Sequence, residues 1–303
     1  MNNASVLVLG AGELGMAVLH SLAQLAPSAD TTLTVLLRPS TLASGAPEKR
    51  RDLDELTSLG INFLPGDLAD SAENLALLFQ NFDTVIGCTG FVTGRSIQLK
   101  LAHAAFEAGV KRYIPWQFGV DYDVIGRGSA QDLFDEQLDV RDFLRAQDRM
   151  EWVIVSTGMF TSFLFEPSFG VVDLALNTVH ALGSWETAVT VTTPEDIGTL
   201  TAQICFAEPR IANSIVYTAG DTITYGRLAD LVETVLGREI KREAWSVPYL
   251  QDELAKDPED SLKKYRVVFA QGRGVAWEIE KTFNFQRSID TRNVEQWARE
   301  NLQ

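Results

Sequence analysis

Three glycines near the start of the chain have the spacing of a loop that can hold a phosphate group. They directly follow the apolar run 6–9 and precede a helical pattern. In such a turn one glycine permits a tight bend, the next lets the backbone approach a pyrophosphate, and the last allows close packing of helix on strand. The helix N-terminus adds free N–H groups and partial positive charge. The pattern therefore predicts a dinucleotide site, with contacts from Gly10, Gly12, Glu13, Leu14 and Gly15.

Basic residues after the second predicted strand favour NADPH over NADH. The apolar run 33–37 is followed by Arg38, at the place where NAD-specific proteins carry an acidic residue for the ribose 2′-hydroxyl. The planar guanidinium group of an arginine pairs well with a 2′-phosphate instead. We expect further contacts from Ser40 and Lys49. The alternative for Arg38 is a solvated arginine that binds no ligand.

A third set of candidate cofactor contacts follows the fourth predicted strand, at 84–87. Ligands of doubly wound folds lie at the carboxyl ends of the strands. We therefore expect Thr89, Gly90 and Phe91 beside the cofactor. An ordinary turn at the end of a strand is the alternative interpretation for each of them taken singly.

These residues are positioned by apolar strands that alternate with helices. Strands are expected at 6–9, 33–37, 62–64, 84–87, 112–115 and 152–155, and helices at 14–25, 48–58, 71–80, 96–108 and 133–146. This alternation predicts an α/β fold with a doubly wound parallel sheet, a Rossmann fold. Later strands are expected at 179–182, 188–192 and 215–217, and helices at 194–206, 224–236, 248–255, 257–269 and 291–302.

The regular alternation of predicted strands and helices ends after residue 156. We therefore predict an NAD(P)-binding Rossmann domain over 1–156 and a smaller, mixed α/β substrate lobe over 157–303. Some segments of this lobe are expected to return to the sheet. Short strands, an aromatic-rich stretch at 159–165 and several helices make up the predicted lobe.

Composition narrows the class of protein. With 26 Lys and Arg against 41 Asp and Glu, the 303-residue chain has a formal net charge of −15, which argues against nucleic-acid and anionic membrane partners. No apolar run reaches transmembrane length and no signal pattern precedes the first strand, so we expect a cytoplasmic protein. Cys88 and Cys205 are predicted to be buried thiols, and no metal spacing is present. A homodimer is the oligomeric state that we consider.

A longer motif carries a family resemblance. The stretch 110–121, Val-Lys-Arg-Tyr-Ile-Pro-Trp-Gln-Phe-Gly-Val-Asp, resembles the "VKRF-PSEFG-D" signature of isoflavone reductase-like and NmrA-like proteins, which are atypical short-chain dehydrogenases. Similarity to that group also extends to the glycine turn, Arg38 and the stretch 193–198. The sequence of residues 115–141 resembles the CipA-type branch of the group. The resemblance spans essentially the whole chain. It implies an NADPH-dependent reductase of an aromatic or polyketide-like small molecule in secondary metabolism, acting at a C=C, C=O or related centre.

The chain departs from the reductases of that group at the position of their acid–base lysine. In them, a lysine follows the signature in the pattern F-x-x-K, and the alignment of Phe134 with this phenylalanine places Gln137 there. An amide can form hydrogen bonds but cannot titrate. The serine and glutamate of the signature are also replaced, by Trp116 and Gln117, and no Tyr-x-x-x-Lys pair is present. The usual general acid is therefore missing.

Other residues must then support hydride transfer. We expect Gln137 to hold a substrate oxygen and Tyr122 or Asp121 to deliver a proton, with Asp123 and water as alternatives. A solvated turn is the competing interpretation for Asp121, and a pocket wall for Tyr122. Gln117 is placed among the cofactor contacts. Aromatic residues suit a flat substrate, and the predicted pocket is Trp116, Phe118, Met159, Phe160, Phe163 and His180, with ordinary core packing as the alternative.

Two further functions fit the same residues. NmrA-like members of the group bind a dinucleotide, lack catalytic residues and act as regulators, and the glutamine at position 137 favours that interpretation. A non-redox enzyme that keeps the fold is the other alternative, because a fold does not determine a function. The aromatic-rich candidate pocket favours the reductase.

Overall fold

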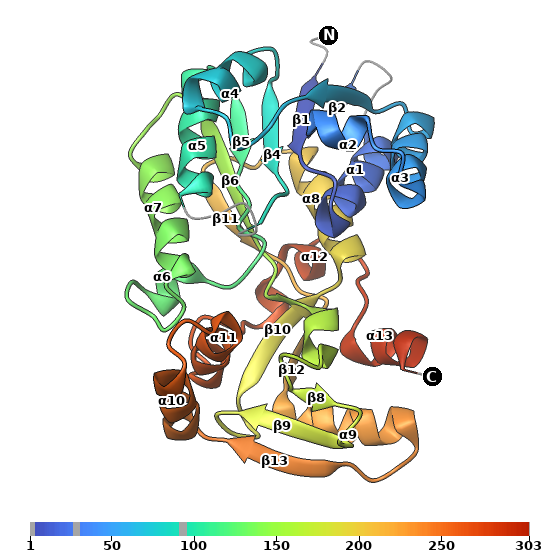
Figure 1. The fold of residues 1–303 in the computed structure, drawn as a ribbon, viewed down its shortest axis with the longest axis vertical. Coiled ribbons are helices and arrows are strands. Elements are labelled where there is room, and N and C mark those ends of the chain that lie inside the picture. Colours follow the sequence, from blue (N-terminus) through green and yellow to red (C-terminus); the bar gives the residue numbers. More distant parts are fainter. Residues whose placement is uncertain (1–3, 27–30, 91–95, 303) are drawn as a thin grey trace. The chain divides into compact units, whose positions relative to one another are not determined.

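A computed structural model describes residues 4–26, 31–90 and 96–302 (Figure 1). The chain forms two compact units, and each unit is assembled from separate stretches of sequence. The first unit comprises Met1–Gln117, Glu136–Val155 and Ile197–Val216, and the second comprises Phe118–Asp135, Ser156–Asp196 and Tyr217–Gln303. The stretches 118–135 and 197–216 thus lie on the other side of the predicted boundary at residue 156.

The first unit is built on a seven-stranded sheet. Its order is β11-β6-β5-β4-β1-β2-β3. The strands are β1 (Ser5–Leu9), β2 (Thr32–Leu37), β3 (Asn62–Pro65), β4 (Thr84–Gly87), β5 (Arg112–Ile114), β6 (Glu151–Ser156) and β11 (Ser214–Tyr217). From β3 across to β6, neighbouring strands pair in parallel. The predicted doubly wound Rossmann fold is confirmed, and β11 adds a seventh strand from the second half of the chain.

Helices cover the sheet because its central strands are apolar on both faces. Leu7, Val8 and Leu9 of β1 have no exposed surface, as expected for a buried parallel strand. The helices are α1 (Glu13–Leu25), α2 (Pro39–Leu42), α3 (Pro47–Ser58), α4 (Ala72–Phe79), α5 (Ile97–Glu107), α7 (Leu133–Arg145) and α8 (Pro194–Cys205). Most agree with the predicted ranges to within two residues. Ser71, predicted as helical, instead caps α4 by accepting a hydrogen bond from Asn74 N–H.

Helix α8 reaches the first unit from far along the sequence. A Cβ atom at Gly198 would lie 2.4 Å from the carbonyl oxygen of Ala17, so glycine permits close packing of α8 on α1. The other end of α8 is held by Arg112 of β5, which is 2% exposed. The guanidinium group of Arg112 donates to the carbonyls of Cys205 (2.7 Å), Ile204 (3.3 Å) and Ile211 (2.7 Å). Burial lowers the pKa of this arginine.

The second unit contains two three-stranded sheets, β12-β10-β7 and β13-β9-β8. The strands are β7 (Met159–Phe160), β8 (Val172–Asp173), β9 (Thr178–Leu182), β10 (Ala188–Thr192), β12 (Asp221–Thr224) and β13 (Lys241–Trp245). The helices are α6 (Tyr122–Ile125), α9 (Tyr225–Leu236), α10 (Val247–Lys256), α11 (Ser261–Ala270), α12 (Phe283–Gln286) and α13 (Val294–Asn301), with 3-10 turns at Thr161–Phe165 and Ile279–Lys281.

Capping residues set the boundaries of these helices. Thr224 caps α9, which ends at the left-handed Gly237. The predicted helix 257–269 begins only at Ser261, because the side chain of Asp260 accepts from Lys263 N–H and caps it. The predicted helix 291–302 likewise begins at Val294, after a capping box at Asn293. Among the described residues, none of the helices has both the length and the apolar character needed to cross a membrane.

Candidate functional site

The glycine turn at the end of β1 combines tight packing with one open position. Gly10 has φ +96°, and an added Cβ would lie 2.5 Å from Thr89 Oγ1. A Cβ at Gly15 would lie 2.2 Å from the Gly10 carbonyl oxygen. The chain's own packing therefore requires glycine at both positions. At Gly12, by contrast, a Cβ would have no heavy atom of the described chain within 4 Å, so this glycine leaves open space above the backbone.

The first turn of α1 presents backbone donors to this open space. Gly12 is the N-cap and supplies no side-chain cap, and the N–H of Met16 donates to the carbonyl of Gly12 at 2.8 Å. The N–H groups of Glu13, Leu14 and Gly15 therefore have no acceptor within the helix. Free N–H groups at the positive end of a helix bind phosphate. The turn thus fits a pyrophosphate group.

The end of β2 lies next to the turn. Gly10 N–H donates to the Leu36 carbonyl at 3.3 Å, and Arg38 follows two residues later as the N-cap of α2. Arg38 is exposed, and its guanidinium group has no hydrogen bond or ion pair within the described part of the chain. Ser40 is exposed on α2, and Lys49 on α3 pairs with Asp52 at 3.3 Å. Arg38 is therefore a cation available to a ligand at this edge of the sheet.

The residues after β4 connect the glycine turn to α5. The hydroxyl of Thr89 donates to the Leu9 carbonyl at 2.8 Å, and Gln98 Nε2 donates to the Thr89 carbonyl at 2.8 Å. A Cβ at Gly90 would lie 2.8 Å from the ring of Trp116, so the indole packs directly over this glycine. Phe91 lies outside the described residues. The predictions for Thr89 and Gly90 agree with their place beside the turn but remain predictions.

Gln137 lies on α7 in the first unit and is completely buried. Neither its amide oxygen nor its amide nitrogen has a hydrogen-bond partner among the described residues. Its backbone is held firmly, because Gln117 Nε2 donates to the Gln137 carbonyl and Gln117 Oε1 accepts from Arg141 Nε, both at 2.8 Å. The preceding Glu136 accepts from Gln98 N–H at 2.9 Å. A buried amide with no partner is costly, so this site favours a polar ligand group.

The hydrogen bonds of Gln117 to Gln137 and Arg141 indicate a structural role for this residue. Both polar atoms of its side chain are engaged on α7, and the residue has no exposed surface. Its predicted contact with the cofactor stays a prediction, and the observed contacts point to the positioning of α7.

The two predicted proton donors belong to the second unit. Asp121 caps α6 by accepting from Val124 N–H at 3.3 Å, and its other oxygen accepts from the Tyr217 hydroxyl at 2.7 Å. Tyr122 is 3% exposed, and a Cβ at Gly119 would lie 2.6 Å from its hydroxyl oxygen. Both side chains are thus engaged in the packing of the unit. Their proposed part in proton delivery remains a prediction.

Phe163, one residue of the predicted pocket, packs among other aromatic rings within the second unit. Phe163 stacks on Phe169 with ring centres 4.5 Å apart and meets Tyr265 edge-on at 6.4 Å. Tyr265 meets Phe134 at 5.7 Å, and Phe134 meets Tyr122 at 4.9 Å. Burial raises the pKa of Tyr265 to about 12. We call these five residues, Tyr122, Phe134, Phe163, Phe169 and Tyr265, the aromatic cluster.

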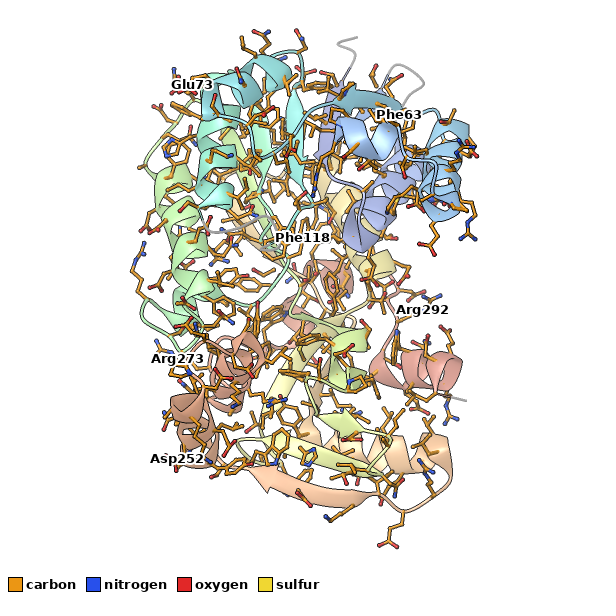
Figure 2. The ribbon with its side chains drawn as sticks, in the orientation of Figure 1. Phe63, Glu73, Phe118, Asp252, Arg273 and Arg292 are labelled. Atoms are coloured by element: carbon orange, nitrogen blue, oxygen red, sulfur yellow. The ribbon has the colours of Figure 1, made fainter. Side chains whose placement is uncertain are left out.

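The remaining pocket residues lie apart from these ring contacts. His180 is on β9, where its ring stacks on Trp245 at 4.0 Å and its Nδ1 lies 2.7 Å from the Gly170 carbonyl oxygen. Met159 and Phe160 form β7, and Phe118, labelled in Figure 2, is 6% exposed. The predicted role of these residues in substrate binding stays a prediction.

Sequence reasoning missed Gln98, Arg141 and Tyr265. A weak signal was present for Gln98, because it interrupts the buried face that Ile97 and Leu101 form on α5. Arg141 is a fully buried arginine on a helix with many charged residues, and no local pattern separates it from its exposed neighbours. Tyr265 joins the aromatic cluster only through long-range packing.

Comparisons with known proteins show that the chain is similar to oxidoreductases of the NmrA-like family. The model of the NmrA-like family matches residues 2–291. An NmrA-like family domain-containing oxidoreductase of Gibberella moniliformis is 48% identical over 297 residues, which cover 98% of this chain and 97% of that protein. An isoflavone reductase homolog of Solanum tuberosum is 30% identical over 269 residues, which cover 84% and 83%.

Solved structures share the fold over almost the full length. AtPrR2 with NADP+ and (+)-pinoresinol has a TM-score of 0.81 at 22% identity, with 99% of both chains covered. The binary complex of leucoanthocyanidin reductase and NADPH from Vitis vinifera has a TM-score of 0.78 at 19% identity, with 98% of this chain and 99% of that chain covered.

Proposed function

The chain belongs to the NmrA-like family, and on that premise we propose that it is an NADPH-dependent reductase of an aromatic or polyketide-like small molecule. Its relatives include a phenylcoumaran benzylic ether reductase of Arabidopsis thaliana, 29% identical over 294 residues. The reaction is the transfer of a hydride from NADPH to a C=C, C=O or related centre of the substrate. The second product is NADP+, and a proton completes the reduction.

The cofactor part of the proposal rests on the open space at Gly12. A dinucleotide that carries a 2′-phosphate suits this space, the free N–H groups of the first turn of α1 and the cation of Arg38, which has no partner among the described residues. The residues present therefore fit NADPH. Bound there, NADPH supplies the hydride, while the chain binds and orients the phosphates.

The substrate part rests on Gln137. The unsatisfied amide can donate a hydrogen bond to a substrate oxygen as negative charge develops on that atom. It cannot deliver a proton, so a substrate such as a quinone or an activated enone suits the site best. Phe160 and Phe163 of the predicted pocket are partly exposed, and flat apolar side chains of this kind pack against an aromatic substrate.

The direct test is NADPH oxidation by the purified protein against a panel of quinones, enones and aryl ketones. We expect turnover with at least one class of acceptor and expect NADH to be a poorer donor. Tight NADPH binding with no turnover on any acceptor would contradict the reductase and leave the cofactor site intact.

Replacement of Gln137 by leucine is expected to lower kcat by about 10²-fold while leaving NADPH affinity unchanged. The two side chains are similar in size, and the loss of one preorganised donor typically costs this much. Steady-state kinetics with the best acceptor and a separate NADPH titration provide the measurement. Unchanged kcat in Q137L would remove the residue from the mechanism.

Replacement of Arg38 by glutamine is expected to raise the KM for NADPH about tenfold or more and to leave the KM for NADH nearly unchanged. The guanidinium group is proposed to pair with the 2′-phosphate, which NADH lacks. The matched control is Arg51→Gln on α3, which removes the same charge from another exposed position. An equal rise in KM for NADPH and NADH would show that Arg38 does not recognise the 2′-phosphate.

A second function is favoured by one observation. The residue aligned with the catalytic lysine of the reductases cannot titrate, which suits a dinucleotide-binding regulator without catalysis. Such a protein is expected to bind NADP+ and NADPH and to reduce no acceptor in the panel. Titrations with both redox forms, run beside the turnover assay, separate the two functions.

A further inference from the structure

The second unit contains two Gly-Arg-Gly turns in which both glycines have a positive φ. In Gly126-Arg127-Gly128 the glycines have φ +82° and +71°, and in Gly272-Arg273-Gly274 they have φ +66° and +72°. Residues other than glycine rarely adopt such backbone angles. At Gly126 and Gly128 an added Cβ would meet no heavy atom of the described chain within 4 Å, so the backbone angle, and not packing, calls for glycine there. Each turn thus presents one arginine from a bend flanked by glycines.

Both turns are fixed in place by hydrogen bonds of their glycines. Gly126 N–H donates to the Tyr122 carbonyl at 2.9 Å, and Gly128 N–H donates to the Asp135 carboxylate at 3.0 Å. The second turn is anchored to the residues before the first, because the Gly274 carbonyl accepts from Asp121 N–H at 2.8 Å. A Cβ at Gly274 would lie 2.8 Å from the Asp121 carbonyl oxygen, so the two segments touch.

The two arginines line one cavity of about 430 Å³ that lies entirely within the second unit. Its apolar wall includes Leu254 of α10 and Val267 and Val268 of α11, and its polar lining includes Ser129 and Gln271. None of its lining residues is acidic, although the whole chain has a net charge of −15. The cavity is large enough for a small organic ligand.

The environment of Arg273 points to a ligand. Arg273 lies three residues after the end of α11 and is exposed (Figure 2). Its side chain makes no hydrogen bond or ion pair with any described residue. Guanidinium groups recognise carboxylate and phosphate with paired hydrogen bonds.

We propose that the cavity between the two Gly-Arg-Gly turns is a binding site for a small anion, a carboxylate or phosphate group carried on an apolar body. Arg273 pairs with the anionic group, Arg127 adds positive charge to the same lining, and the apolar body lies against Leu254, Val267 and Val268. This site goes beyond the proposed reductase activity, because its residues are distinct from the glycine turn and from Gln137.

The test is calorimetric titration of the full-length protein, without NADPH, against phenyl phosphate, benzoate and neutral benzyl alcohol. We expect one of the two anions to bind measurably and the neutral alcohol not to bind. The stronger of the two identifies phosphate or carboxylate as the preferred group. Arg273→Gln is expected to weaken binding about tenfold, as the loss of one charge-assisted contact implies, and raised ionic strength is expected to weaken it further. Arg238→Gln, an exposed arginine of the same unit outside the cavity lining, is the matched control and should bind as the wild type does.

A second variant separates this site from the glycine turn. Gly12→Val alters the proposed cofactor site and should leave anion binding at the cavity unchanged. Binding that survives in R273Q but disappears in G12V would assign the anion to the glycine turn and overturn the proposal. The absence of binding by either anion would also overturn it, whatever the outcome of the turnover assay.

Discussion

A protein with valine in place of Gly12 is expected to fold normally and to bind NADPH at least about a hundredfold more weakly. Gly12 has φ −77° and ψ −169°, which any residue adopts, and a Cβ there meets nothing in the described chain. The added side chain would instead occupy the space proposed for the pyrophosphate, next to the free N–H groups of α1. A hundredfold loss corresponds to about 2.7 kcal/mol of binding free energy. Fluorescence titration with NADPH and thermal unfolding together measure both expectations.

Gly45 offers a matched control for this substitution. It also lacks a positive φ, and a Cβ there would again meet no heavy atom within 4 Å. Gly45→Val should therefore fold and bind NADPH nearly as well as the wild type. If G12V retained wild-type affinity, or if both variants lost it equally, the open position at Gly12 would not be the cofactor site.

Replacement of Arg112 by methionine is expected to lower the free energy of unfolding by about 3 kcal/mol or more. Methionine keeps the apolar stem but removes hydrogen bonds to three backbone carbonyls, two of which end α8. Buried carbonyls left without donors cost about 1–3 kcal/mol each, and the cation also complements the negative end of the helix. Urea denaturation followed by circular dichroism measures the change.

The adjacent Lys111 provides the comparison. Its side chain is 68% exposed and pairs with Asp83 at the surface at 2.5 Å. Surface ion pairs contribute about 1 kcal/mol or less, so Lys111→Met should be nearly neutral. A loss of stability in R112M no greater than in K111M would show that the clamp on α8 is not a major source of stability.

Local chemistry explains why the fold could be predicted. Strands such as β1 and β4 are mainly apolar because both faces of a parallel sheet are covered, and that pattern is visible in the sequence. Caps such as Thr224 and terminators such as Gly237 act over a few residues, so the limits of α9 were predicted well. The glycine turn is equally local, which is why its relation to β1 and α1 could be foreseen.

Long-range contacts explain what could not be predicted. Asp121 was expected to deliver a proton, but its hydrogen bond joins it to Tyr217, 96 residues later. The pairing of the two Gly-Arg-Gly turns brings together Arg127 and Arg273, which are 146 positions apart, and neither stretch of sequence predicts contact with the other. Gln137 could be singled out because it aligns with the lysine of the family's reductases. That its amide has no partner among the described residues could be seen only in the folded structure.

The division of each unit into separate stretches limits how this protein can be recombined with its relatives. A fragment that stops at residue 156 would lack α8 and β11, and it would leave the edge of β6 with unpaired backbone groups that invite aggregation. A chimera made with one crossover would likewise combine residues of both parent proteins in the hydrophobic core of each unit. Exchange of one intact unit needs several junctions at once, so family shuffling should succeed only where breakpoints follow the five chain crossings that separate the stretches.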